Sequence, residues 1–312
     1  MNVLVWHVHG SWTTAFVQGE HRYIVPVVPD RGPDGRGRAR TWDWPASVVE
    51  RTPEELAREP VDVVILQRPA ELDGLAERWL GGRRPGRDVP AVYLEHNAPQ
   101  GPIGEMRHPA ADRQDLTIVH VTQFNALFWS TGGARACVIE HGVIDPGVRY
   151  TGELPHAAVV INEPGRRGRV TGTDLLPRFA AAAPIDLFGI GAAAFGGFEN
   201  LRQDHLHTEM ARRRVYLHPL RWTSLGLSLI EAMHLGMPVV ALATTEAPEA
   251  VPREAGVIST SVDALVGAVR RLVRDPSRAR AMGEAAREHA LARYGLRRFL
   301  SDWDALLAEV AR

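Results

Sequence analysis

A turn followed by a helix that carries a carboxylate is the part of the sequence best suited to bind a charged ligand. It lies in RWTSLGLSLIEAMHLGMPVV, residues 221–240, where Ser224 and Gly226 precede an apolar helix that Gly236 should end. Free backbone N–H groups and the positive end of the helix dipole favour phosphate there, and Gly226 lets a ligand approach the backbone. Glu231 lies about a turn and a half further on, where it could accept hydrogen bonds from ribose hydroxyls. The same pattern also fits an ordinary capped helix, because Glu is a good helix former.

Arginine is the permanent cation that this chain can offer to a phosphate. All 36 basic side chains are Arg and there is no Lys, which excludes a Schiff base and a Walker lysine. Three of them, Arg166, Arg167 and Arg169, stand in EPGRRGRVTG between a predicted strand and a predicted helix. A loop there could direct at least one of them towards a diphosphate, although an arginine-rich loop is usually just solvated.

Polar residues also follow the first predicted strand, in HVHGSWTTA. His7 and His9 would share one face of a strand, so a metal pair is conceivable, but the neighbouring sequence offers no third ligand. We therefore predict no metal. We expect His9, Gly10 and Ser11 to form hydrogen bonds to sugar or phosphate, because open sheets bind ligands at the carboxyl ends of their strands.

Other histidines differ in their setting. His96, in YLEHNAPQG, ends a predicted strand and is the candidate for a site. His120, in TIVHVTQFN, is the second choice and equally fits a core histidine. His205 and His207 precede TEMARRR and are expected on the surface of a helix.

Short apolar runs bounded by Gly, Pro or His predict the elements that would hold these residues. The runs lie at residues 2–8, 23–28, 62–67, 91–96, 117–121, 136–142, 157–163, 184–191, 214–219, 238–243 and 256–260. Because parallel strands need crossover helices, two such sets predict two doubly wound α/β domains. We place them at 1–150 and 151–295, with a C-terminal helix at 296–312 whose apolar face should pack back on the first.

The composition narrows the possible partners. A formal net charge of −1 provides no electrostatic footprint for nucleic acid or anionic lipid. No segment reaches the roughly 18 apolar residues of a membrane span, and the first residues lack the basic and apolar regions of a signal peptide. We expect a cytoplasmic protein with no nucleic-acid partner and no transmembrane segment.

The stretch HPLRWTSLGLSLIEAMHLGMPVVALATTEAPEAV, residues 218–251, resembles the nucleotide-sugar segment of retaining glycosyltransferases of family four, the glycosyl transferases group 1. The residues in register with that pattern are Gly226, Leu227, Glu231, Ala232, Met233, Gly236, Pro238, Val239, Val240, Pro248 and Glu249. The resemblance implies the GT-B fold, in which two doubly wound Rossmann-like domains face a cleft. It also implies a nucleoside diphosphate sugar as donor substrate, and neither a metal nor another cofactor.

The resemblance implies that Glu231 binds the donor ribose and that His96 and Arg166 are the catalytic residues. The other donor-binding residues would be Thr223, Ser224, Leu225, Gly226, Leu227, Arg167, Arg169 and Gly189. Thr223 departs from the family pattern, which has a first Glu at this position. The implied reaction moves a hexosyl group to a hydroxyl acceptor with retention. Fixed donors stabilise the departing diphosphate and a donor phosphate oxygen acts as base, so no protein nucleophile is needed.

Other functions compete with this one. A sugar-nucleotide epimerase can use the same fold, and a non-catalytic module that binds nucleotide sugars would fit the loss of the first Glu at Thr223. A dinucleotide-dependent oxidoreductase is weaker, because FGIGAAAFGG has Ala194 where the glycine fingerprint after a strand needs its last Gly.

Overall fold

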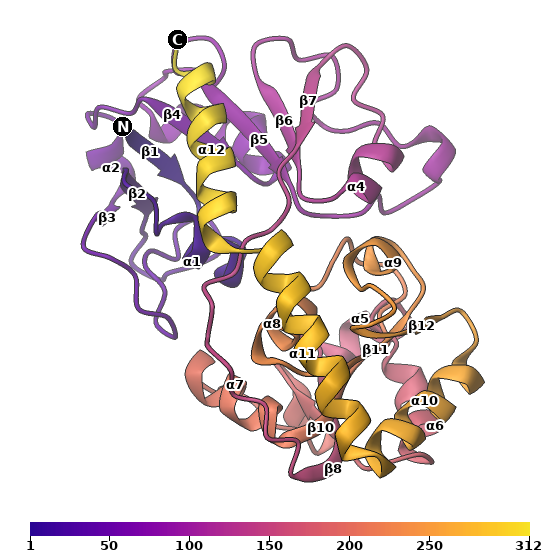
Figure 1. The fold of residues 1–312 in the computed structure, drawn as a ribbon. Helices are drawn as coiled ribbons and strands as arrows, with labels where there is room; N and C mark the ends of the chain where they lie inside the picture. The colour runs from indigo at the N-terminus through magenta and orange to yellow at the C-terminus, as the bar shows by residue number, and fades with distance from the viewer. The chain divides into compact units, whose positions relative to one another are not determined.

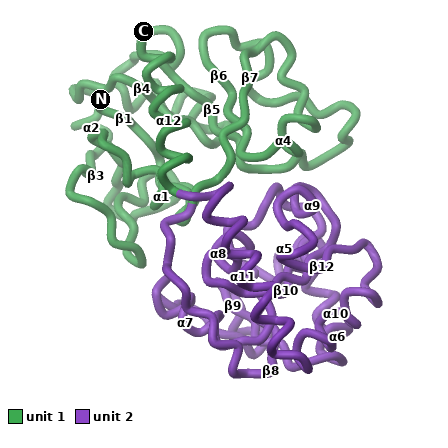
Figure 2. Tube along the Cα trace, viewed as in Figure 1, with its two compact units in different colours: residues 1–142, 296–312 green, residues 143–295 purple.

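The computed structural model describes residues 1–312, which form two compact units (Figures 1 and 2). Unit 1 contains residues 1–142 and 296–312, and unit 2 contains residues 143–295. Each unit is built on one sheet of parallel strands. Both ends of the chain therefore belong to unit 1.

The sheet of unit 1 has seven strands in the order β3-β2-β1-β4-β5-β6-β7. They are β1 (Asn2–Val5), β2 (Arg22–Pro26), β3 (Val48–Arg51), β4 (Val63–Leu66), β5 (Ala91–Glu95), β6 (Thr117–His120) and β7 (Arg135–Val138). From β1 the chain first adds strands on one side and then, from β4 onward, on the other. Because all the strands are parallel, their carboxyl ends meet at one edge of the sheet.

Aromatic side chains fasten the C-terminal helix of unit 1 to its first helix. The helices are α1 (Gly10–Phe16), α2 (Pro53–Leu56), α3 (Ala76–Trp79), α4 (Gln123–Phe128) and α12 (Leu296–Val310), with the short turns η1 (Glu71–Leu75) and η2 (Ile103–Glu105). The ring of Trp303 in α12 lies 5.6 Å from that of Trp12 and 5.0 Å from that of Phe16, both in α1. All three side chains are buried, so this contact is part of the core of unit 1.

The sheet of unit 2 has five strands in the order β12-β11-β10-β8-β9. They are β8 (Leu154–Val160), β9 (Ile185–Phe188), β10 (Arg213–His218), β11 (Val239–Leu242) and β12 (Gly256–Ser259). β8 pairs with β9 on one side and with β10 on the other. The order of the strands therefore reverses beside β8.

Helices cover both faces of this second sheet. They are α5 (Pro164–Thr171), α6 (Leu176–Ala180), α7 (Gln203–Arg212), α8 (Leu227–Leu235), α9 (Ala247–Ala250), α10 (Val262–Arg274) and α11 (Pro276–Arg293), with the short turns η3 (Thr173–Leu175) and η4 (Ala192–Phe195). One buried cluster joins α7, α8 and α11 and includes Met210 and Leu229. The other joins α6 and α10 and includes Phe179 and Leu265. This three-layer arrangement buries the strands on both sides.

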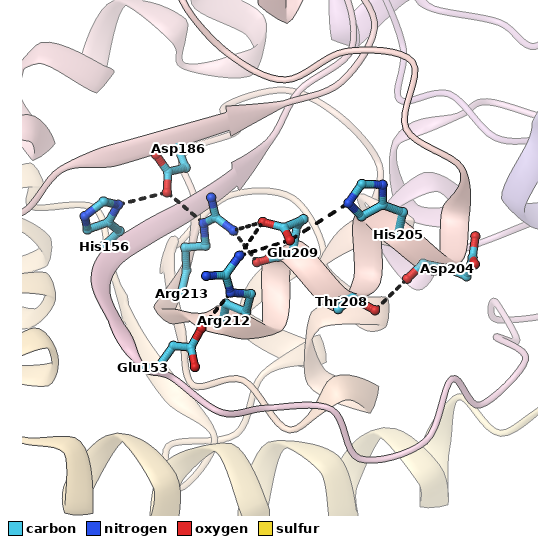
Figure 3. A network of polar contacts seen from close by, with 9 residues as sticks. All are labelled: Glu153, His156, Asp186, Asp204, His205, Thr208, Glu209, Arg212 and Arg213. Carbon is cyan, nitrogen blue, oxygen red and sulfur yellow. Dashed lines mark hydrogen bonds and ion pairs between the residues drawn. The ribbon is translucent and has the colours of Figure 1, made fainter.

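A network of charges holds the amino edge of this sheet (Figure 3). The buried Arg213 donates to Asp186 at 2.7 Å, and to the backbone oxygen and carboxylate of Glu209, each at 2.7 Å. His156 lies 2.9 Å from the same Asp186 carboxylate. Burial by itself would raise the pKa of Asp186, but the hydrogen bonds from His156 and Arg213 lower it. The network ties the end of α7 to β9 and β10.

The prediction of two doubly wound parallel α/β sheets is confirmed. Each of the apolar runs singled out in the sequence overlaps a strand. β3 was missed, because VVER has only two apolar residues before its charges and forms a half-buried edge strand. An edge strand needs fewer apolar residues than a central one, so its sequence lacks the run on which the prediction depended.

Candidate functional site

The reversal of strand order beside β8 defines the place in unit 2 where a ligand is expected. In open parallel sheets, ligands bind outside the carboxyl ends of the strands at such a switch point. The loops that follow β8 and β10 both start there. They are the two segments in which the sequence placed the donor-binding arginines and the turn before Glu231.

The turn after β10 has the form that the sequence predicted. α8 begins at Leu227 after Gly226, and ends where Gly236 takes a left-handed φ of 86°. A Cβ on Gly226 would lie 2.7 Å from Cε1 of His218, so any larger residue would have to displace that buried ring. Ser224 and Leu225 are buried, whereas Thr223 and Leu227 are partly exposed.

Glu231 lies on the second turn of α8 and is only 5% exposed. Its Oε2 is 3.4 Å from Nε2 of His207, which belongs to α7 and is also buried. The sequence prediction that His207 lies on a helix surface is therefore wrong, because α7 turns this side chain towards α8. The prediction is right for His205, whose side chain is 60% exposed and faces Glu209 (Figure 3).

The arginines after β8 differ in exposure. Arg166 is exposed and forms an ion pair with Glu163, the residue before α5. Arg167 is half-buried, and its pKa is lowered by burial and by the charge of Arg166. Arg169 is exposed and lies 3.4 Å from Asp174. Arg166 and Arg167 thus lie in the first turn of α5, and Arg169 lies after the kink at Gly168.

Gly189, at the end of β9, is required by close packing. It has a φ of 131°, and a Cβ there would lie 2.3 Å from the backbone oxygen of Ile161. The next residue, Ile190, donates its N–H to the side chain of Asn162, which follows β8. This pair of contacts joins the turn after β9 to the loop that carries the arginines.

Two buried polar residues near the turn were not singled out in the sequence. His218 ends β10 and has no hydrogen-bond partner for Nδ1 within the protein. Burial lowers its pKa to about 4, so it is neutral at pH 7. Glu246 follows β11, is 1% exposed, and its N–H lies 3.4 Å from the backbone oxygen of Ser224. The strand-ending position of His218 in RVYLHP was the available signal for the first of these.

Gly236→Ala should lower the free energy of unfolding by about 1–2 kcal/mol, because an L-residue is strained in the left-handed region. The added Cβ itself would make only ordinary contacts, at 3.6 Å to Tyr150 and 3.9 Å to Gly283. Urea denaturation measures this effect. The control is Gly267→Ala inside α10, which should raise the same free energy by roughly 0.5–1 kcal/mol. A loss of stability in both variants would contradict this explanation.

Unit 1 has its own switch point, between β1 and β4, and three histidines gather at this edge of the sheet. The ring of His9, after β1, lies 3.9 Å from that of His96, after β5. The ring of His141, after β7, is stacked at 6.2 Å from His96. His141 was not singled out in the sequence, because its segment lies far from the other two along the chain.

Gln67, directly after β4, orients the central histidine of this cluster. Its amide donates to the backbone oxygen of Trp6 at 2.7 Å, and its oxygen lies 3.2 Å from Nε2 of His96. The amide therefore accepts a hydrogen bond from His96 and favours the tautomer protonated at Nε2. Both side chains are buried, so this contact fixes the ring.

All three histidines of the cluster are neutral at pH 7. Burial, then the neighbouring His9 and His141, hold the pKa of His96 well below its usual 6.5. Burial lowers the pKa of His9 to about 4 and that of His141 to about 3, with smaller effects from Arg36 on His9 and from His9 and Arg298 on His141. Each ring can donate a hydrogen bond to a ligand or accept one from it, and brings no positive charge to the site.

The other polar candidates of unit 1 lie elsewhere or have packing roles. His7 does not share a strand face with His9, because β1 ends at Val5 and His7 contacts the backbone oxygen of Gly37 at 2.9 Å. Gly10 begins α1, where a Cβ would lie 2.6 Å from the ring of Trp42, and Ser11 follows it half-buried. His120 is fully buried in β6, and neither ring nitrogen has a hydrogen-bond partner.

Two general features of the chain bear on its partners. No group of three or more His, Cys, Asp or Glu side chains is arranged to hold a metal ion. None of the helices combines the length and the apolar composition that a membrane span requires.

Comparison with known proteins gives the family of one segment and the fold of the whole chain. Residues 193–289 match the family model of glycosyl transferases group 1, which confirms the resemblance seen in the sequence. No curated protein matches the chain.

Three solved structures share the fold over nearly the full length. A sucrose-phosphate synthase from Thermosynechococcus elongatus is 13% identical, with 99% of each chain covered and a TM-score of 0.74. HepE from Anabaena in complex with UDP-glucose is 14% identical, with 99% of this chain and 100% of that chain covered and a TM-score of 0.68. A glycosyltransferase from Rickettsia africae is 13% identical, with 100% and 98% covered and a TM-score of 0.66. The chain therefore has the GT-B fold.

Proposed function

We propose that the protein is a retaining glycosyltransferase that transfers a hexosyl group from a uridine diphosphate sugar to a hydroxyl acceptor without a metal. One observation carries the proposal: the group 1 segment supplies a turn, a helix N-terminus and Glu231 beside the switch point of the sheet of unit 2. That is where a parallel sheet binds its ligand. Uridine is chosen because HepE, which shares the fold, is described in complex with UDP-glucose.

In this proposal unit 2 binds the donor nucleotide. Glu231 accepts hydrogen bonds from the ribose hydroxyls, and the amides at the start of α8, with Ser224 and Arg166, hold the diphosphate. Negative charge grows on the diphosphate as the bond to the sugar breaks, so donors fixed there lower the barrier most. Thr223 replaces a carboxylate of the family pattern and would offer only a hydroxyl to the sugar.

Unit 1 is the acceptor side in this proposal, with His9, Gly10 and Ser11 in the loop that approaches the ligands. His96 donates to, or accepts from, the transferred sugar as a neutral imidazole. Attack by the acceptor hydroxyl occurs on the face that the diphosphate leaves, and a phosphate oxygen takes the hydroxyl proton. The anomeric configuration is then retained without a covalent enzyme intermediate.

UDP should stabilise the protein in a thermal-shift panel of nucleoside diphosphates, since a ligand at 100 times its Kd adds about 2.7 kcal/mol. A labelled UDP-hexose incubated with hydroxyl acceptors should then yield a labelled glycoside and UDP. Free UDP with an epimerised sugar and no acceptor would instead identify an epimerase. Stabilisation by UDP with an intact donor under all conditions would indicate a non-catalytic module, which the loss of the carboxylate at Thr223 favours.

A further inference from the structure

The carboxylate proposed to hold the ribose is itself held by a second helix. Oε2 of Glu231 and Nε2 of His207 are 3.4 Å apart, and both side chains are more than nine-tenths buried. A buried carboxylate is costly unless charged or polar groups satisfy it. His207 therefore helps to offset the cost of burying the Glu231 carboxylate.

Gln203, one turn earlier on α7, restrains the histidine ring. Its side-chain amide lies 2.8 Å from the same Nε2 of His207. The amide nitrogen faces the ring as placed, and a half-turn of the amide would bring its oxygen there instead. The single proton of a ring protonated at Nε2 would then be shared between the Glu231 carboxylate and that oxygen. The imidazole is thus fixed between an amide of its own helix and a carboxylate of α8.

The helix that carries His207 is fixed in turn. α7 packs against α8 through the buried cluster that includes Met210. Its last turn is tied to the sheet by Glu209 and the buried Arg213 (Figure 3). His207 lies two residues before Glu209, so the backbone directly after it is anchored to α8 and to the sheet.

We propose that His207 is a positioning residue that orients the Glu231 carboxylate for the donor ribose. The inference rests on the proposed function, because it assumes that Glu231 contacts the ribose. A glutamate has three side-chain torsions, and binding a ligand would otherwise have to immobilise them. The contact from His207 fixes them beforehand, so the carboxylate meets the hydroxyls in one orientation.

The test compares UDP with 2′,3′-dideoxy-UDP, which lacks both ribose hydroxyls, by isothermal titration calorimetry. His207→Phe keeps an aromatic ring without a hydrogen-bond donor. We expect it to raise the Kd of UDP by about three- to tenfold, as loss of one hydrogen bond does, and to leave the Kd of the dideoxy analogue unchanged. His207→Gln, which keeps a donor, should recover most of the affinity for UDP.

Matched controls separate positioning from folding. His205→Gln changes an exposed histidine of the same helix and should leave both Kd values unchanged. If His207→Phe does not fold, His207→Asn serves instead, because its amide is too short to keep the contact with Glu231. Equal weakening of both nucleotides by either variant would show a purely structural role and overturn the inference.

Glu231→Gln distinguishes failure of the inference from failure of the proposed function. If Glu231→Gln weakens UDP selectively while His207→Phe does not, His207 has no positioning role, and the proposed ribose contact stands. If Glu231→Gln leaves UDP affinity unchanged, Glu231 does not contact the ribose, and the positioning role of His207 is refuted as well. If UDP does not bind the parent protein, the proposed function fails before either variant is measured.

Discussion

His96→Leu is expected to lower kcat for sugar transfer by about 10²- to 10³-fold, as removal of one fixed hydrogen-bonding group from a developing charge does. The Kd of UDP should change little, because the proposed nucleotide contacts all lie in unit 2. Leucine has a similar volume, so the packing against His9 and Trp12 should largely survive. Single-turnover kinetics with a labelled donor would measure the chemical step directly.

The protonation state of His96 adds a second expectation. Burial and its two histidine neighbours keep its pKa well below 6.5, so the ring is neutral at every pH from 6.5 upward. Because this pKa is lowered, the charged form of the ring appears only when the pH falls well below 6.5. The pH profile of kcat should therefore show no step near 6.5 that His96→Leu abolishes.

A second buried histidine of the same sheet provides the control. His120 is fully buried, has a pKa lowered to about 4 by burial and by His108, and its ring nitrogens make no hydrogen bond. His120→Leu should leave kcat unchanged, because it removes no contact to a ligand. A fall in kcat of the same size in both variants would mean that packing of the sheet, and not His96, sets the rate.

The secondary structure of this chain was largely predictable, because buried parallel strands are nearly continuous apolar runs and their pattern is local. The turn and helix of residues 221–236 were predictable for the same reason: Gly226 and Gly236 mark both ends within a few residues. β3 was not, since an edge strand with one face half-exposed carries too short an apolar run.

Contacts between segments far apart in the chain could not be predicted from the sequence. His207, Met210 and Ala211 follow the spacing of one helical face, but the charged residues around them obscured which face α7 buries. The contact of His207 with Glu231 depends on how α7 packs on α8. The cluster of His9, His96 and His141 depends likewise on contacts between distant segments, because these residues follow β1, β5 and β7, which are not neighbours in the sheet.

To bind a diphosphate, Arg166 must exchange the carboxylate partner that it already has. Arg166 is paired with Glu163 in an exposed ion pair, and the same pairing lowers the pKa of Glu163. An exposed ion pair of this kind is weak, because solvent screens it. A diphosphate carries more negative charge than one carboxylate and offers two oxygens to the planar guanidinium. The diphosphate is therefore expected to displace Glu163 from Arg166.

Arg166→Ala should accordingly raise the Kd of UDP several-fold and leave that of uridine nearly unchanged, as measured by calorimetry. Glu163→Gln should act in the opposite direction and tighten UDP, because it removes the competing carboxylate. Arg178→Ala is the control, since Arg178 is also exposed and paired with a carboxylate, that of Asp263, but lies on α6. If Arg166→Ala weakened uridine as much as UDP, Arg166 would not act on the phosphates, and the half-buried Arg167 of the same turn would be the next candidate.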